Sequence, residues 1–83
     1  MNDIPTLSVT KVLAEPYPVK RGGVKLFGVR YGYREIFYTD ELPNVEVGAQ
    51  ILVPEYGVYT VTHSAGDLII IENEGLQARI EKR

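Results

Sequence analysis

The residue types that many enzymes use for nucleophilic chemistry come together once in this chain, at His63, Ser64 and Asp67. In a strand, neighbouring side chains point to opposite faces, so His63 and Ser64 do not face one substrate together. Asp67 lies across a turn from them, and no oxyanion-stabilising feature accompanies the three residues. We therefore interpret this stretch as the polar tip of a hairpin and expect no catalytic residues.

Glu72 and Glu74 are spaced like paired carboxylates. General acid–base catalysis would need one of them in an apolar pocket, but they flank Asn73 in a predicted turn, where water surrounds both. Together with Asp67 they lack the spacing of a calcium loop, and one His without any Cys gives no ligand set for zinc. We expect no metal, no other cofactor and no enzymatic activity.

The segment 20–23, Lys-Arg-Gly-Gly, resembles glycine-containing loops that bind phosphate. It lacks the Gly-Lys-Ser/Thr ending of a P-loop and does not open onto a helix. We interpret it as a mobile basic loop that can contact a nucleic-acid backbone or an acidic protein partner. Tyr33 is the tyrosine expected to make contacts, beside Arg34 at a hairpin tip, because tyrosine is common at protein interfaces and stacks on bases.

Charge is divided unevenly along the chain, although the net charge is only −2. Residues 11–34 contain six basic residues and one acid, Glu15, whereas residues 35–78 contain eight acids and no Lys or Arg. A domain with one basic and one acidic flank can attract a polyanion to one side, or it can bind copies of itself head to tail.

The length of 83 residues predicts one domain, 1–83, and a composition of 45% hydrophobic and 24% charged residues is typical of a globular protein. The longest aliphatic run, residues 68–71, is far shorter than a membrane span. The first ten residues have neither the basic nor the apolar region of an export signal. We expect a cytoplasmic protein with no membrane contact.

Gly and Pro punctuate segments rich in Val, Ile, Tyr, Phe and Thr, which is the composition of strands. Short strands at this spacing predict an all-β fold, a small antiparallel SH3-like barrel of about five to six strands. A first strand is expected near residues 7–13, with Pro16 and Pro18 ending it. Further strands are expected near residues 24–31, 34–39, 50–53, 58–63, 68–72 and 76–83.

The hairpin between residues 24 and 39 is predicted to turn at Gly32-Tyr33, with glycine first as a type II′ turn requires. This register pairs Arg30 with Glu35 and places Phe37 over Gly28. One apolar face, expected to be the core face, then consists of Phe27, Val29, Tyr31, Ile36 and Tyr38.

Two family resemblances involve the middle of the chain. Val47-Gly48, Ile51, Val53-Pro54, Tyr56-Gly57-Val58 and Val61 resemble the opening of Tudor- and KOW-type small barrels. The longer stretch 36–42, followed by Val47-Gly48, Ile51, Val53 and 59–61, resembles phage head–tail joining proteins, as do 14–16 and 22–24 upstream. The second resemblance implies a protein without enzymatic activity that assembles into a ring around a portal axis.

We therefore expect a non-catalytic adaptor that acts through protein–protein contacts, including self-association into a homo-oligomer. The alternative is a module that binds nucleic acid or a transcription complex through the same basic hairpin. The predicted basic contact residues are Lys20, Arg21, Arg30, Tyr33 and Arg34. The predicted acidic interface residues are Asp40, Glu41, Glu72 and Glu74.

Overall fold

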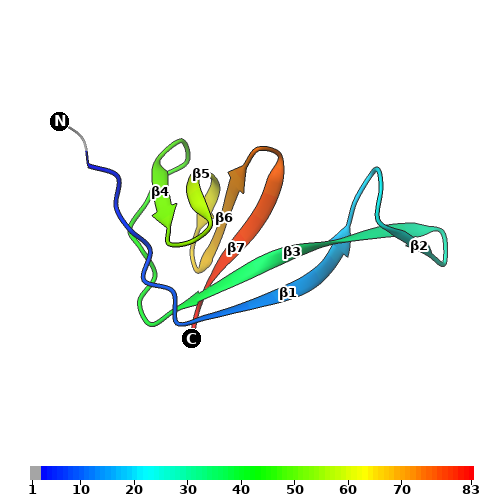
Figure 1. Ribbon diagram of the computed structural model, residues 1–83, viewed down its shortest axis with the longest axis horizontal. Coiled ribbons are helices and arrows are strands. Elements are labelled where there is room, and N and C mark those ends of the chain that lie inside the picture. The colour runs from blue at the N-terminus through cyan, green and yellow to red at the C-terminus, as the bar shows by residue number, and fades with distance from the viewer. Residues whose placement is uncertain (1–2) are drawn as a thin grey trace.

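The computed structural model describes residues 3–83, so residues 1–2 of the predicted domain lie outside the described residues. Every element of this part is a strand, which confirms the all-β prediction (Figure 1). No helix among these residues is long and apolar enough to cross a membrane. The strands are β1 (Lys11–Pro18), β2 (Val24–Leu26), β3 (Val29–Thr39), β4 (Gln50–Val53), β5 (Gly57–Ala65), β6 (Leu68–Asn73) and β7 (Leu76–Lys82).

All seven strands belong to one open sheet with the order β1-β3-β7-β6-β5-β4, and β2 pairs with the free part of β3. The predictions of five to six strands and of purely antiparallel pairing are wrong, because β3 and β7 are parallel. Local patterns predict hairpins between consecutive strands, but they do not reveal that the last strand returns to β3. The SH3-like barrel stays a prediction.

The N-terminal segment connects the two outer strands of the sheet. Leu52 in β4 donates its N–H to the Pro5 carbonyl and accepts the N–H of Leu7, each at 2.8 Å. The segment then continues into β1, which pairs with β3. The predicted strand at residues 7–13 is therefore shifted: the regular strand begins at Lys11 and runs through Pro16 and Pro18, the residues expected to end it.

Proline is accepted within β1 because β1 is an edge strand. Val19, which follows β1, donates its N–H to the Arg30 carbonyl at 2.9 Å. In an antiparallel pair, hydrogen-bonded and non-hydrogen-bonded residues alternate, so the backbone nitrogens of Pro16 and Pro18 face the free edge. Neither proline removes a hydrogen bond from the ladder between β1 and β3.

The hydrophobic core lies on the face of β3 that carries Phe37, which has no exposed surface. The Phe37 ring makes edge contacts with Tyr56 and Tyr59, at centroid distances of 5.0 and 5.8 Å. Such pairs add to the free energy gained by burial alone. The other buried residues of this core are Leu7, Ile51, Val53, Val61, Ile69, Ile71, Ala78 and Ile80.

The predicted hairpin at Gly32-Tyr33 is wrong, because β3 runs straight through both residues. The turn lies at Phe27-Gly28, where φ is 51° and 81°, and two positive φ values in succession are what a type I′ turn requires. Val24 therefore pairs with Tyr31 across the turn, whereas the predicted hairpin placed both residues in one strand. Glycines 28 and 32 both permit a turn, but only the turn at Gly28 forms.

This shift reverses the expected faces of the hairpin. Phe27, expected in the core, is fully exposed, and Phe37, expected on the opposite face, is the buried residue. Ile36 is buried and Tyr38 is half-buried on the face of β3 away from the core. A change of register moves whole sets of side chains from one face to the other, because side chains alternate along a strand.

The free energy of unfolding should fall above pH about 10, because the unfolded chain ionises Tyr59 more easily than the folded chain does. Burial raises the pKa of the Tyr59 hydroxyl, and the charges of Glu35 and Tyr56 raise it further. The Tyr59 contribution to stability is complete below the ordinary tyrosine pKa of about 10 and is lost as the pH rises through the raised pKa.

Urea unfolding measured across this alkaline range tests the prediction. Tyr59→Phe should remove much of the pH dependence, whereas Tyr33→Phe, a change at an exposed tyrosine, should retain it. Equal alkaline sensitivity of the two variants would contradict the assignment to Tyr59.

Candidate interaction site

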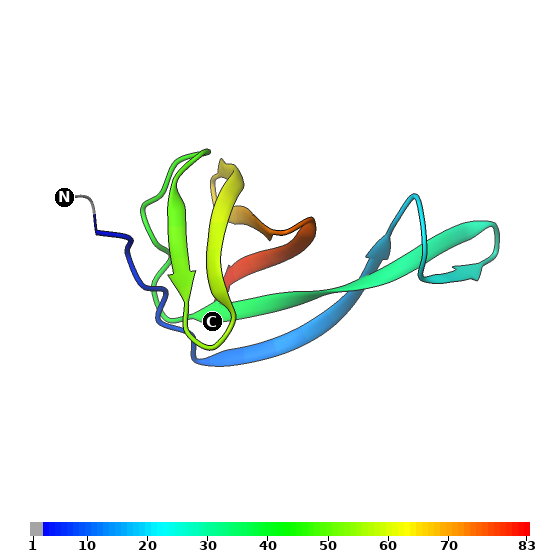
Figure 2. The same cartoon turned by 45° about the horizontal axis from the view of Figure 1, so that its top comes forward.

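A β-arm formed by residues 16–33 projects from the body of the molecule (Figures 1 and 2). The molecule measures 47 × 26 × 25 Å. The arm exists because β3, at 11 residues, is longer than its pairing with the body requires. Only residues 35–39 of β3 pair with β7, and the part nearer the N-terminus is flanked by the end of β1 and by β2.

One face of the arm is an exposed apolar groove of about 450 Å³. It is lined by Pro16, Val24, Leu26, Phe27, Tyr31 and Tyr33. Phe27 is fully exposed at its tip and adopts a positive φ, a conformation that is unfavourable for a bulky residue. Strained residues often lie at functional sites, and together with its full exposure this makes Phe27 a candidate contact residue.

The arm carries four basic residues and no acid. Lys20 and Arg21 lie in the loop between β1 and β2, while Lys25 and Arg30 are directly opposite each other across β2 and β3. None of the four forms a salt bridge with another residue in the 3–83 range. Like charges facing each other across strands are destabilising, so an acidic surface close to the arm would reduce the repulsion between Lys25 and Arg30.

Arg34, predicted to make external contacts at a hairpin tip, instead lies at the base of the arm and bonds within the chain. Its Nε donates to Glu15 at 2.7 Å, and its guanidinium lies 5.1 Å from the centre of the Tyr17 ring. Glu15 also contacts Arg79 at 3.3 Å. These half-buried contacts join β1, β3 and β7 where the arm meets the body.

The predicted acidic interface is divided between two places. Asp40 and Glu41 follow the C-terminal end of β3, whereas Glu72 and Glu74 lie at the turn before β7 begins. Because β3 and β7 are parallel, the two pairs lie at opposite ends of the sheet. They do not form a single surface.

Glu72 and Glu74 belong instead to a surface that we call the acidic face: Leu52, Val58, Glu55, Glu72 and Glu74. Leu52 and Val58 are cross-strand neighbours, and both are exposed because their neighbours in sequence fill the core. Thr60 pairs with Glu72, and Glu74 lies in the turn that joins β6 to β7. Glu55 lies in the turn that joins β4 to β5.

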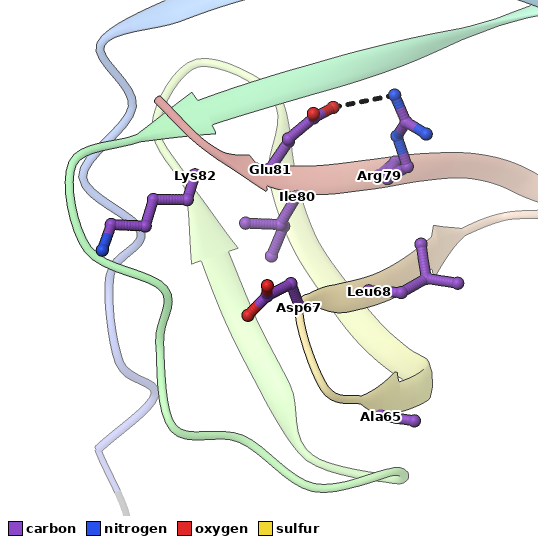
Figure 3. A pocket seen from close by; sticks show the side chains of 7 residues that line it. All are labelled: Ala65, Asp67, Leu68, Arg79, Ile80, Glu81 and Lys82. Atoms are coloured by element: carbon purple, nitrogen blue, oxygen red, sulfur yellow. Dashed lines mark hydrogen bonds and ion pairs between the residues drawn. The ribbon is translucent and has the colours of Figure 1, made fainter.

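The remaining polar candidates do not form a catalytic group. The Ser64 hydroxyl donates to the Val45 carbonyl at 2.8 Å, and His63 lies in β5 opposite Ile70. Asp67 lines a separate cavity of about 420 Å³, in which Arg79 points to Glu81 (Figure 3). The ion pair between these two side chains measures 2.8 Å. No cluster of three His, Asp or Glu side chains suited to a metal ion occurs in residues 3–83.

Sequence reasoning located the basic residues of the arm but missed its apolar tip. The missing signal was the near-symmetry of residues 25–30, Lys-Leu-Phe-Gly-Val-Arg, around Phe27-Gly28. In a hairpin centred there, Leu26 faces Val29 and Lys25 faces Arg30, as observed. Two like charges facing each other are destabilising, and the cost is reduced where a partner supplies the opposite charge.

The arm and the acidic face each combine exposed apolar side chains with charges of one sign. Such a combination provides burial of apolar area together with electrostatic selection of the partner. Comparison with protein-family models, curated proteins and solved structures finds no match to this chain, so these two surfaces carry the case for its function.

Proposed function

We propose that this chain is a non-catalytic assembly module that associates with other copies of itself through the arm. The observation that carries the proposal is the arm tip, where Phe27 is fully exposed in a strained conformation next to an apolar groove. Exposed apolar patches on small proteins commonly mark interaction sites. A basic arm and an acidic face on one chain supply both halves of a contact between copies.

The proposal includes an SH3-like architecture for the body and a role like that of phage head–tail joining proteins. Support for the first is the N-terminal segment, which hydrogen-bonds β4 at one side of the sheet and continues into β1 at the other. Support for the second is the resemblance of residues 36–42 and 59–61 noted above. A cytoplasmic location is part of the same proposal.

The basic residues of the arm also support a second candidate, a nucleic-acid-binding module. Protein contact is favoured because the groove side chains at the tip are aliphatic as well as aromatic. The acids of the body would repel a long polyanion that approached any surface except the arm.

Light scattering should give an oligomeric mass at about 50 mM salt and a smaller mass at about 500 mM, because salt screens contacts between exposed charges. Phe27→Ser should be monomeric at both salt concentrations, with an unchanged circular dichroism spectrum. Val47→Ser provides the control, since Val47 is also an exposed apolar residue but lies in the link between β3 and β4.

An oligomer of unchanged mass in the Phe27→Ser variant would refute the role of the arm. A wild-type chain that is monomeric at both salt concentrations would refute self-association. A gain of mass only on addition of a short DNA duplex would favour the nucleic-acid-binding module instead.

A further inference from the structure

We propose that the arm of one copy docks on the acidic face of the next copy, an inference that rests on the proposed self-association. The arm carries the apolar groove on one face, Lys25 and Arg30 on the other face, and Lys20 and Arg21 in the loop between β1 and β2. The acidic face presents Glu55, Glu72 and Glu74 near Leu52 and Val58. The two surfaces therefore match in charge and in apolar character. Neither set of charges is used in a salt bridge among residues 3–83.

The contact is made by side chains rather than by strand addition. The free edge of β1 in the arm carries Pro16 and Pro18, whose nitrogens face outward and donate no hydrogen bond. On the other edge, β2 is only three residues long. A partner strand would find few donors on either edge, whereas the apolar groove is open to an approaching face.

The lone acid near the arm does not compete for the basic residues. Glu15 is held at the base by Arg34 and Arg79, at 2.7 and 3.3 Å. Lys25 and Arg30, which pair with each other across β2 and β3, therefore have no salt-bridge partner among residues 3–83. The second copy supplies three carboxylates on one face of its sheet.

Each chain carries one arm and one acidic face, and these are different surfaces. Repetition of the contact from copy to copy produces a closed ring or an open filament, whereas two copies that exchange arms reciprocally form a two-fold dimer. A ring of this kind needs every copy to contribute both surfaces. A chain that lacks either surface would terminate the assembly.

Engineered cysteines test the contact directly, because the chain contains no cysteine of its own. Val29→Cys places a thiol on the arm beside Leu26, and Thr60→Cys places one on the acidic face opposite Glu72. Both variants leave Phe27, Val58 and the acids in place. Ala65→Cys is the matched control, an exposed position in β5 at the end of the strand remote from the acidic face.

Mixed under mild oxidation at low salt, the Val29→Cys and Thr60→Cys chains should form a disulfide-linked heterodimer. The rate should exceed that of the Val29→Cys and Ala65→Cys mixture by at least about tenfold, because docking raises the effective concentration of the two thiols. Arg21→Glu in the arm chain should slow this linkage, and Glu74→Arg in the partner chain should restore it.

If Val29→Cys forms disulfides with positions 60 and 65 at equal rates, the acidic face is not the docking site. The proposed function would still stand in that case, provided that self-association depends on Phe27. Failure of Glu74→Arg to restore linkage lost through Arg21→Glu would overturn the charge pairing. A monomeric wild-type chain would overturn both this inference and the self-association on which it rests.

Discussion

Replacing Phe37 by alanine should lower the free energy of unfolding by about 3–5 kcal/mol, the range for truncation of a buried phenylalanine. Phe37 has no exposed surface and contacts the rings of Tyr56 and Tyr59. A domain of this size has a total stability of only about 5–15 kcal/mol, so the variant should be at or near the threshold of folding. Urea unfolding followed by circular dichroism gives the change.

The chain supplies its own control, because its only other phenylalanine is the fully exposed Phe27. Phe27→Ala makes the same chemical change and should shift the free energy of unfolding by no more than about 0.5 kcal/mol. The pair of variants also tests the strand register, since the turn at Gly32-Tyr33 would bury Phe27. A larger loss from Phe27→Ala than from Phe37→Ala would refute the register of β3 described above.

Gly23→Ala should break the pairing of β2 with β3 and disorder the tip of the arm. A Cβ atom at residue 23 would lie 1.9 Å from the backbone oxygen of Tyr31, so the two backbones must separate. The positive φ of residue 23 adds a further cost of about 1–2 kcal/mol for any residue with a side chain. Backbone amides in β2 and in the facing part of β3 should lose protection from hydrogen exchange, while those of β5 and β6 keep it.

Gly22→Ala is the control that tests the effect of a positive φ without a close backbone contact. Gly22 also has a positive φ, of 72°, but a Cβ atom there would meet nothing within 4 Å. This variant should therefore keep β2 paired, and its self-association should resemble that of the wild type. Equal loss of protection in both variants would mean that the positive φ alone, and not the close approach to Tyr31, makes glycine necessary at residue 23.

The strands of the C-terminal half were predictable because their signals are local. Predicted strands at residues 50–53 and 68–72 correspond to β4 and β6, where apolar residues alternate between turns. The arm was not predictable in the same way. Turns at glycine 28 and at glycine 32 both give reasonable pairs, and only the long-range pairing of β1 with Gly32 and Tyr33 shows that β3 continues through the second glycine.

The candidate site shows the same limit. Lys20, Arg21, Arg30 and Tyr33 are exposed on or near the arm, as a loop and a hairpin tip rich in such residues suggested. Arg34 differs because its partner, Glu15, is brought opposite it by the long-range pairing of β1 with β3. Likewise, Asp40 and Glu74 are separated by the parallel pairing of β3 with β7, which charge counts along the chain do not reveal.

Strand β3 passes from the core into the arm without a break in its hydrogen-bonded ladder. The arm is therefore ordered in the isolated chain, and an association through it as proposed would lose little conformational entropy. The same continuity couples the arm mechanically to the core, because a force applied at the tip is transmitted along the backbone of β3 to Phe37. Any assembly built through the arm would be as stiff as the sheet itself.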